Sequence, residues 1–335
     1  MAIKIAINGF GRIGRLAFRK LFEEKSVEII AINDLGNVEA LSYLLQYDSA
    51  HGTWKSGKIK ADKSKNTINV NGKIIKVCQE KEPKALPWKT HGVDIVIEAT
   101  GRFTTKELAQ AHLDAGAKKV VISAPAKGDL KTIVYNVNHN LLKSTDNIIS
   151  GASCTTNCLA PVIHALEAEF GIIKGWMTTV HAATNDQRLL DLEHTDFRRG
   201  RSAMTNIVPA ATGAAAAIGL VIPSVKGKLD GSAMRVPIIT GSIVDLTVEL
   251  KKNVTVEQVN TAMKKHSSES FGYNEDPIVS TDIIGSSFGS IFDATLTKVI
   301  EVEGKQMVKV FAWYDNEMSY VSQLVRTVLH IAKLK

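Results

Sequence analysis

The sequence predicts an α/β protein with two domains, a doubly wound parallel sheet followed by an α+β domain with a mostly antiparallel sheet. The chain of 335 residues is longer than one typical domain. As far as about residue 150, short Val- and Ile-rich runs alternate with helical patterns, which is typical of a parallel sheet. Longer runs of alternating apolar and polar residues follow, and these favour an antiparallel sheet with one covered face. We expect domains over 1–151 and 152–316, with a C-terminal helix over 317–335 that joins the first domain.

The first domain is expected to contain five short strands and a helix that ends near Glu24. The strand runs are rich in β-branched residues: Lys4–Asn8, Val27–Asn33, Asp94–Ala99, Lys119–Ser123 and Thr132–Asn136. The helix should follow the first of these runs directly. Such an alternation builds a sheet with helices on both faces.

The second domain should hold longer strands with helices between them. The strand runs are Lys174–His181, Leu229–Val236, Ser242–Leu250 and Met307–Trp313. The helical runs are about Thr155–Phe170, Thr212–Gly219 and Val256–Ser270. A last amphipathic helix, about Glu317–Lys335, has an apolar stripe of Val321, Leu324, Val325, Val328, Leu329 and Ala332. This stripe predicts that the helix packs back onto the first domain.

The composition, with 44% apolar and 22% charged residues, is that of an ordinary globular protein. The N-terminus does not resemble a secretory signal. The longest nearly apolar stretch, Ala210–Ile222, is shorter than the roughly 18–20 residues that span a bilayer. Three cysteines are too few for a disulfide framework. We therefore expect a cytoplasmic protein in a reducing compartment, with no membrane partner.

The net charge of +7 predicts anionic partners. The basic residues are scattered along the chain, and aromatic residues make up only 6%. A specific nucleic-acid site would need a basic stripe with stacking aromatic side chains. The partners should therefore be small phosphorylated molecules, with no specific nucleic acid.

The segment Gly9–Gly14 (GFGRIG) follows the first predicted strand and opens the first helix. Asp34 lies 20 residues beyond Gly14, at the end of the second predicted strand. This combination is the fingerprint of a Rossmann dinucleotide-binding domain. A carboxylate at that position can accept hydrogen bonds from both hydroxyls of the adenosine ribose and would repel a 2′-phosphate. We therefore expect NAD rather than NADP.

Each position of this segment has an expected role. Gly9 permits the tight turn, Gly11 lets the pyrophosphate approach the backbone, and Gly14 lets helix and strand pack closely. The N–H groups of Arg12 and Ile13 should face the phosphates at the helix N-terminus. Ligands of open α/β sheets also bind at the carboxyl ends of later strands, where the sequence has Thr100 and Ser123.

Cys154 is the predicted nucleophile. Ser153 is suited to cap the helix that follows, which places Cys154 in the first helical turn, where a thiolate is favoured. Lowering a thiol pKa from about 8.5 to about 6 requires roughly 3.4 kcal/mol. A helix terminus supplies only about 0.3–1 kcal/mol, and at most about 2. A second, cationic neighbour is therefore needed, and we expect an imidazolium.

Among nine histidines, His181 is the best candidate for a general base. It ends a predicted strand and precedes the polar run Thr184–Arg188, so it should face a cleft, although a structural role is the alternative for a lone histidine. Cys158 is expected in the core. A zinc site formed by Cys154, Cys158 and His164 is conceivable, but no second cysteine pair supports it, and we expect no metal.

Six blocks, in the same order along the chain, make the sequence resemble glyceraldehyde-3-phosphate dehydrogenase over essentially its whole length. They are Ile7–Gly14, Ser123–Pro125, Ala152–Asn157, Thr212–Ala215, Arg235–Pro237 and Trp313–Glu317. Several ordered blocks are far more specific than any single motif. The resemblance implies a phosphorylating, NAD-dependent aldehyde dehydrogenase of glycolysis that assembles as a homotetramer.

The resemblance also implies a mechanism. Cys154 would attack the aldehyde carbon of glyceraldehyde 3-phosphate to form a hemithioacetal, and His181 would take the hydroxyl proton as hydride passes to NAD. Inorganic phosphate would then attack the thioester and release 1,3-bisphosphoglycerate. Asn316 would bind the nicotinamide carboxamide and fix which face of the ring receives the hydride.

Two anion sites follow from the same resemblance. Thr184 and Arg235 match the site for the substrate phosphate. The site for the attacking phosphate matches hydroxyl, amide and guanidinium groups at Ser153, Thr155, Arg199, Thr212 and Gly213. Alternatives stay open for the arginines, because Arg199 could be a solvated or interface residue and Arg235 could form a salt bridge between domains.

The sequence departs from the family pattern at three positions. Lys81, expected near the adenine, stands where an arginine is common. Glu193 replaces a usual proline, in a loop that approaches the adenosine of a neighbouring subunit in the family. Ala216 stands where a lysine is frequent. None of these positions touches the reacting atoms.

Other functions remain open. The same chemistry on erythrose 4-phosphate is performed by a related enzyme group, although the residues around Thr212 favour the phosphorylating reaction. A binding protein that kept only the cofactor fold would not need Cys154, His181 and both anion sites. A nucleic-acid-binding role rests on the net charge alone.

Overall fold

The structure, a computed structural model, describes residues 2–334 and divides into two units, each built on an eight-stranded sheet. The first unit contains the chain as far as Ile133, then His139–Ala152, and the chain from Leu324 onward. The second contains Val134–Asn138 and Ser153–Gln323. A mostly parallel sheet in the first unit and a mostly antiparallel sheet in the second confirm the predicted fold class.

The sheet of the first unit has the order β3-β4-β5-β2-β1-β6-β7-β8. Six of its strands pair in parallel: β1 (Ile3–Asn8), β2 (Val27–Asn33), β5 (Lys73–Cys78), β6 (Ile95–Glu98), β7 (Lys119–Ile122) and β8 (Ile148–Ser150). The edge is extended in antiparallel fashion by β3 (Ile59–Asp62) and β4 (Thr67–Val70). The strand order reverses between β1 and β6, and ligands of such sheets bind at the carboxyl ends of the strands there.

Four α-helices lie in this part of the chain: α1 (Arg12–Phe22), α2 (Val38–Gln46), α3 (Trp88–His91) and α4 (Lys106–Asp114). Short 3-10 turns occupy Pro83–Ala85 and His139–Leu141. The apolar face of α1 is fully buried at Leu16, Phe18 and Leu21, and the strand β1 is buried at Ile5 and Ile7. The helix α1 therefore packs against β1, and the glycine-rich segment connects the two elements.

The sheet of the second unit has the order β10-β11-β9-β12-β16-β14-β13, with β15 paired to β16. The strands are β9 (Ile172–Ala182), β10 (Val208–Ala211), β11 (Leu229–Val236), β12 (Ser242–Leu250), β13 (Phe271–Asn274), β14 (Ser290–Asp293), β15 (Lys298–Val302) and β16 (Lys305–Tyr314). Two pairs, β9 with β11 and β13 with β14, are parallel, and the rest are antiparallel.

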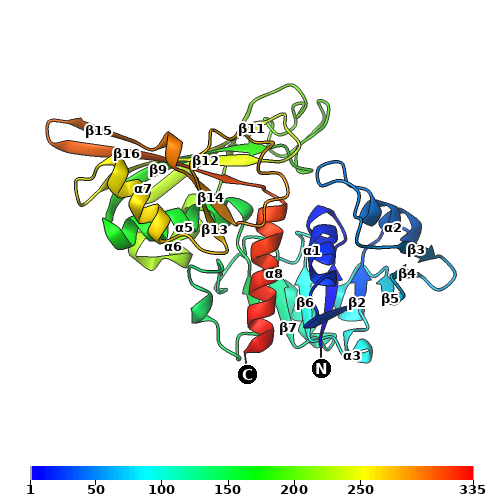
Figure 1. Ribbon diagram of the computed structural model, residues 1–335. Helices are drawn as coiled ribbons and strands as arrows, with labels where there is room; N and C mark the ends of the chain where they lie inside the picture. Colours follow the sequence, from blue (N-terminus) through cyan, green and yellow to red (C-terminus); the bar gives the residue numbers. More distant parts are fainter. Residues whose placement is uncertain (1, 335) are drawn as a thin grey trace. The chain divides into compact units, whose positions relative to one another are not determined.

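Helices α5 (Cys154–Glu169), α6 (Ala214–Val221) and α7 (Val256–Lys265) lie on one side of this sheet (Figure 1). Two 3-10 turns occupy Pro223–Val225 and Ala294–Leu296. Burial along β12 alternates strictly from one residue to the next, as the apolar–polar pattern predicts. The helices therefore cover the apolar face, and the ends of the strands carry the polar side chains described below.

The last helix, α8 (Met318–Lys333), is shared between the units: its residues as far as Gln323 belong to the second and those from Leu324 onward to the first. Val321, Leu324, Val325 and Val328 of the predicted stripe are buried, whereas Leu329 and Ala332 are only partly buried. Across residues 2–334, no helix is both long and apolar enough to cross a membrane.

Two expected elements are wrong. The run Thr132–Asn136 is not a strand: Thr132 makes an isolated bridge to Ser150, and the strand beside β7 is Ile148–Ser150. The chain turns instead, because the Asn138 side chain accepts a hydrogen bond from the N–H of Val134 at 2.8 Å. The turn Val134–Asn138 also belongs to the second unit, outside the domain range expected for it.

The second error concerns the end of α7, which stops at Lys265 rather than near Ser270. The Ser267 hydroxyl donates to the carbonyl of Lys264 at 2.7 Å, and the N–H of Ser270 donates to Ser268 at 3.3 Å. Such local side-chain bonds compete with helical ones.

Close packing explains two glycines of the segment Gly9–Gly14. Gly9 has φ +92°, and a Cβ atom on it would lie 2.7 Å from the carbonyl carbon of Ala99. A Cβ atom on Gly14 would lie 2.1 Å from the carbonyl oxygen of Gly9. Gly11 differs, because its φ is −71° and a Cβ atom there would meet no protein atom within 4 Å. Packing thus requires glycine at 9 and 14, while position 11 faces open space.

We predict that Gly14→Ala destabilises the protein and that Gly11→Ala does not. The Gly14 variant should lower the free energy of unfolding by roughly 1–3 kcal/mol, because the added methyl overlaps backbone. The Gly11 variant should change it by less than about 0.5 kcal/mol. Chemical denaturation without cofactor, followed by circular dichroism, measures both, and equal stability of the two variants would contradict this account.

Candidate active site

Asp34 follows β2 and connects it to the glycine-rich segment of the first unit. Its Oδ2 accepts a hydrogen bond from the N–H of Phe10 at 2.8 Å, and its Oδ1 accepts one from the N–H of Gly36 at 2.9 Å. Each oxygen of a carboxylate has two lone pairs, so each retains capacity for a hydroxyl donor. The same carboxylate that was expected to bind a ribose therefore also holds the loop that would carry the phosphates.

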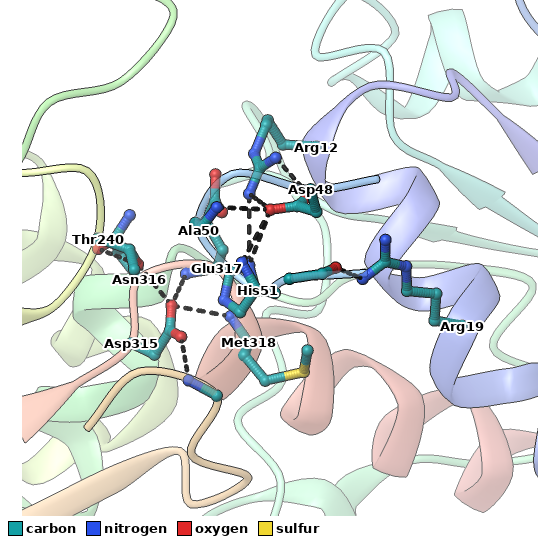
Figure 2. A network of polar contacts seen from close by, with 12 residues as sticks. Arg12, Arg19, Asp48, Ala50, His51, Thr240, Asp315, Asn316, Glu317 and Met318 are labelled. Atoms are coloured by element: carbon teal, nitrogen blue, oxygen red, sulfur yellow. Dashed lines mark hydrogen bonds and ion pairs between the residues drawn. The ribbon is translucent and has the colours of Figure 1, made fainter. Parts of the chain in front are cut away.

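Arg12 begins α1, and its guanidinium is held by the buried carboxylate of Asp48 (Figure 2). The two Nη atoms lie 2.5 and 3.0 Å from the Asp48 oxygens. Burial opposes ionisation of Asp48, but hydrogen bonds from His51 and Arg12 outweigh it and hold the pKa of this carboxyl well below its usual range. Asp48 is thus ionised at neutral pH and fixes the orientation of Arg12. The N–H of Ile13 lies in the same first turn of the helix.

Glu98 fixes the carboxyl ends of β1 and β6. This fully buried carboxylate accepts hydrogen bonds from Asn8 Nδ2 at 2.5 Å and from the N–H of Thr100 at 2.8 Å. His112 lies 2.9 Å away through Nε2, and because its Nδ1 accepts from Trp88 at 3.0 Å, Nε2 carries the proton. The carboxylate therefore positions Thr100.

The two remaining expected cofactor residues of this unit, Ser123 and Lys81, differ in their surroundings. The N–H of Ser123 donates to the main-chain carbonyl of Glu98 at 2.8 Å, which places it at the end of the adjacent strand. Lys81 is exposed in the turn after β5. Glu98 and Asp48 are not among the residues predicted from the sequence, although a lone acidic residue at the end of an apolar strand is a signal that could have identified Glu98.

In the second unit, α5 begins at Cys154, and Ser153 is its N-cap, as predicted. The Ser153 hydroxyl accepts from the N–H of Thr156 at 3.1 Å. His181 lies near the end of β9 and is 3% exposed, and its Nε2 lies 3.4 Å from Cys154 Sγ. The fold thus brings a thiol at a helix start into hydrogen-bond contact with an imidazole at a strand end.

Arg235 pairs with His181 in the register of β9 and β11, so both side chains lie on one face of the sheet. Arg235 Nη1 lies 2.7 Å from His181 Nδ1 and 3.3 Å from the carbonyl oxygen of Ala182. That oxygen lies 2.7 Å from the same Nδ1. Nδ1 therefore donates to Ala182 in one tautomer and accepts from Arg235 in the other.

Burial and the charge of Arg235 lower the pKa of His181 to about 3. Burial also raises the pKa of Cys154, against the opposing charge of Arg235 and a hydrogen bond from Thr155. These shifts favour a neutral imidazole over the imidazolium that we expected and oppose the thiolate, and the fixed cation beside the pair is the Arg235 guanidinium.

Cys158 lies one turn further along α5 and is a core residue, as expected. It is fully buried against Ser290 and the carbonyl of Ala312, and burial raises the pKa of its thiol to about 12. Within residues 2–334 there is no group of three or more His, Cys, Asp or Glu side chains arranged to hold a metal ion.

Arg199, one of the residues expected to bind an anion, is held by neighbouring carboxylates. Arg199 forms ion pairs with Asp186 and Asp196, and its Nη2 donates to the carbonyl of Ala211 at 3.3 Å, beside Thr212. The field of Arg199 also contributes to the lowered pKa of His181.

The hydroxyl groups of the anion set differ in accessibility. Thr212 is half-buried and accepts from the N–H of Ala214 at 3.2 Å, with Gly213 exposed between them at the start of α6. Thr184 is also half-buried, and its N–H lies 3.4 Å from Gln187 Oε1. Thr155 is 4% exposed, and its hydroxyl lies 2.9 Å from that of Tyr314. Its side chain therefore faces the core.

Asn316 follows β16, and three donors fix the orientation of its amide. Oδ1 accepts from the hydroxyl of Ser242 at 3.1 Å and from the N–H of Gly241 at 3.1 Å. It also accepts, at 3.2 Å, from the Thr240 hydroxyl, whose single proton is shared with Asp315 Oδ1 at 2.7 Å. Figure 2 shows Thr240 beside Asn316 and Asp315. Because a main-chain N–H only donates, the atom that faces Gly241 must be the oxygen. The amide N–H groups of Asn316 are thus directed away from these donors.

Comparisons with known proteins agree with this arrangement. The family model for the NAD binding domain of glyceraldehyde 3-phosphate dehydrogenase matches residues 3–106, and that for its C-terminal domain matches residues 153–316. Glyceraldehyde-3-phosphate dehydrogenase of Clostridium pasteurianum is 58% identical over 333 residues, which cover 99% of each chain. The enzyme of that name from Streptococcus pyogenes is 56% identical over 337 residues, which cover 100% of this chain and 99% of the other.

The chain belongs to the glyceraldehyde-3-phosphate dehydrogenase family. It is therefore an NAD-dependent oxidoreductase of glycolysis that acts on small molecules, which confirms the predicted family and cofactor. The residues fit NAD: the glycine-rich segment of this family member leaves open space at Gly11, and Asp34 retains acceptors for hydroxyl groups.

We predict that His181→Asn slows alkylation of Cys154 by iodoacetamide about tenfold at pH 7. Burial disfavours the thiolate, so the thiol depends on His181 Nε2 to take its proton. The rate should regain its wild-type value only at higher pH. Mass spectrometry of the modified peptides measures it, with Cys158, which should remain unmodified in the folded protein, as the internal reference. Equal rates in the variant and wild type would exclude the proposed proton transfer.

Proposed function

We propose that this protein converts D-glyceraldehyde 3-phosphate, inorganic phosphate and NAD to 1,3-bisphosphoglycerate and NADH, through a hemithioacetal and a thioester on Cys154. The observation that carries the proposal is the 3.4 Å contact between Cys154 Sγ and His181 Nε2 at the start of α5. Two guanidinium groups, of Arg235 and Arg199, lie close enough to His181 to lower its pKa. A nucleophile, a base and an anion-binding set are thus available in one unit.

In the first step, Cys154 Sγ bonds to the aldehyde carbon, and its proton passes through His181 to the new alkoxide. A neutral imidazole whose Nε2 is unprotonated is the form that can accept this proton. That tautomer carries its proton on Nδ1 and donates it to the Ala182 carbonyl. A substrate phosphate that engages Arg235 would draw the guanidinium from Nδ1 and favour this tautomer.

In the second step, His181 removes the hemithioacetal hydroxyl proton as the carbon is oxidised to the thioester. NAD, when bound, supplies the hydride acceptor. We propose that its nicotinamide carboxamide is held by the amide N–H groups of Asn316, because the amide oxygen is already engaged by three donors. The adenosine end would be bound by the segment Gly9–Gly14 and Asp34, with Thr100, Ser123 and Lys81 as further contacts.

In the third step, a phosphate oxygen attacks the thioester carbon, the C–S bond breaks, and the His181 imidazolium returns its proton to the Cys154 sulfur. The attacking phosphate would be bound by Arg199, Thr212 and Gly213, and the bond from Arg199 to the Ala211 carbonyl, beside Thr212, supports this assignment. Ser153 and Thr155 would contribute chiefly main-chain N–H groups, because both hydroxyls are engaged within the protein. The substrate phosphate would be bound by Thr184 and Arg235.

The decisive assay follows NADH formation with glyceraldehyde 3-phosphate, with and without phosphate or arsenate. We predict that the rate requires one of these acyl acceptors and that Cys154→Ala lowers it by more than about 10⁴-fold, as expected for loss of a covalent nucleophile. His181→Asn should lower kcat about 10²–10⁴-fold. Equal rates without any acyl acceptor would contradict the phosphorylating reaction.

Erythrose 4-phosphate, tested in the same assay, distinguishes the second candidate. Faster turnover of this aldose than of glyceraldehyde 3-phosphate would assign the protein to that reaction instead.

We predict that Asp34→Ala narrows the preference for NAD over NADP about tenfold in kcat/KM, because the carboxylate repels a 2′-phosphate. Affinity for NAD should fall as well, since the variant removes the acceptor for the Phe10 N–H. Titration calorimetry with both cofactors separates these effects, and thermal unfolding of the cofactor-free variant is the control. An unchanged ratio of kcat/KM for NAD to that for NADP would show that Asp34 does not determine the cofactor preference.

We also propose a cytoplasmic homotetramer. The loop between β9 and β10 exposes large apolar side chains, which favours self-association: Leu189, Leu190, Leu192, Phe197, Met204 and Ile207. Glu193 and Ala216 are exposed. Sedimentation equilibrium measures the assembly, and a monomer at assay concentrations would refute it.

A further inference from the structure

Ser242, the first residue of β12, lies between two groups to which the proposed mechanism gives separate tasks. Its hydroxyl oxygen accepts a hydrogen bond from the N–H of Ala182 at 3.0 Å. Its hydroxyl proton is donated to Asn316 Oδ1 at 3.1 Å. The side chain is 1% exposed, so water does not replace either bond. One buried hydroxyl therefore joins the end of β9 to the segment after β16.

The chain of hydrogen bonds continues from Ala182 to the base. The Ala182 carbonyl oxygen lies 2.7 Å from His181 Nδ1 and accepts its proton in the tautomer that leaves Nε2 able to take a proton from Cys154. Ala182 itself is fully buried. The two bonds of Ser242 have fixed directions, since the Ala182 N–H can only donate, which leaves the Ser242 proton for Asn316, whereas the bond between Ala182 and His181 forms in one tautomer of the imidazole.

We propose that Ser242 is a positioning residue that couples Asn316 to His181 through the main chain of Ala182. The proposal rests on the proposed function, in which Asn316 binds the carboxamide of NAD and His181 is the base. Ser242 touches neither substrate nor cofactor. It sets the orientation of the amide at one end and the position of the Ala182 carbonyl, and with it the His181 tautomer, at the other.

Thr240 offers a matched comparison within the same network. Its hydroxyl also reaches Asn316 Oδ1, at 3.2 Å, and it donates to Asp315 Oδ1 at 2.7 Å. Among the residues that the structure describes, its hydroxyl bonds neither Ala182 nor His181. Loss of the Thr240 hydroxyl should therefore loosen the amide of Asn316 alone, whereas loss of the Ser242 hydroxyl should affect both ends of the series.

The base has several charged and polar neighbours that a pH measurement would also report. Cys154 faces His181 from α5, Arg235 faces it from β11, and the ring of Tyr314 lies 5.9 Å away from β16. Arg199 acts on it through its charge. None of these groups is altered by a substitution at Ser242, so a change in the pH dependence can be assigned to the Ala182 contact.

The test uses the full-length protein and two readouts that do not depend on turnover. Calorimetry gives the affinity for NAD, and alkylation of Cys154 by iodoacetamide as a function of pH, in cofactor-free protein, reports the state of His181. Ser242→Ala should lower NAD affinity roughly tenfold and slow alkylation at pH 7 roughly tenfold, moving the profile to higher pH. Thr240→Val should weaken NAD binding to a similar degree and leave the alkylation profile unchanged.

Two further variants guard the interpretation. Ser242→Cys keeps nearly the same side-chain volume with weaker hydrogen bonds, so it replaces Ser242→Ala if that variant does not fold. It should lower NAD affinity and the alkylation rate by less than tenfold. Ser322→Ala removes another buried hydroxyl, which donates to the Met318 carbonyl at 2.8 Å, and should change neither readout.

The proposal is overturned if both Ser242 variants keep the wild-type alkylation profile, or if Thr240→Val shifts that profile as much as they do. Failure of the proposed function would be seen separately, as a wild-type protein that forms no NADH in the presence of glyceraldehyde 3-phosphate and phosphate. A wild type that passes this assay, with Ser242 variants indistinguishable from it, would refute the coupling alone.

Discussion

The ladder of strand β9 is the constraint on which the candidate active site depends. Its parallel pairing with β11 sets His181 opposite Arg235, and its antiparallel pairing with β12 ends next to Ser242. Because side chains alternate across a strand, a slip of one residue would turn His181 to the other face of the sheet. The Ser153 cap fixes where the helix α5 begins, and with it the position of Cys154.

Burial decides the protonation of the groups held by this ladder. Removing a thiol and an imidazole from water disfavours the charged form of both, and a guanidinium beside the imidazole disfavours its protonation further. Both shifts act in the same sense, because each opposes the charged form of a group in the Cys154–His181 pair. In the proposed function, a substrate anion at Arg235 would offset the positive charge that opposes protonation of His181.

Sequence reasoning was most successful where periodicity and local chemistry agree. The strands Val27–Asn33, Leu229–Val236 and Ser242–Leu250 have the predicted bounds, and the N-cap at Ser153 follows from residue type alone. The turn at Val134–Asn138 could not be predicted from its apolar residues, because the Asn138 side chain accepts a hydrogen bond from the backbone N–H of Val134 there. From the sequence we could expect a thiol and an imidazole to act together, but not the geometry of the Cys154–His181 contact.

What the sequence could not predict is how many donors converge on one buried acceptor. Glu98 and Asn316 are single polar residues at strand ends, and nothing in the sequence places their partners, which come from distant segments. The charge state of His181 was also beyond reach. It depends on the distance to Arg235, which is 54 residues away in the chain and adjacent only across the sheet.

The double engagement of Asp34 has a consequence for protein engineering. Its two oxygens already accept hydrogen bonds from the backbone at Phe10 and Gly36, so this carboxylate supports the loop in addition to its proposed role in cofactor choice. A redesign toward phosphorylated dinucleotides that simply deletes it would sacrifice rigidity together with selectivity. The neighbouring Leu35, whose side chain is 53% exposed, is the better place to introduce a compensating cation.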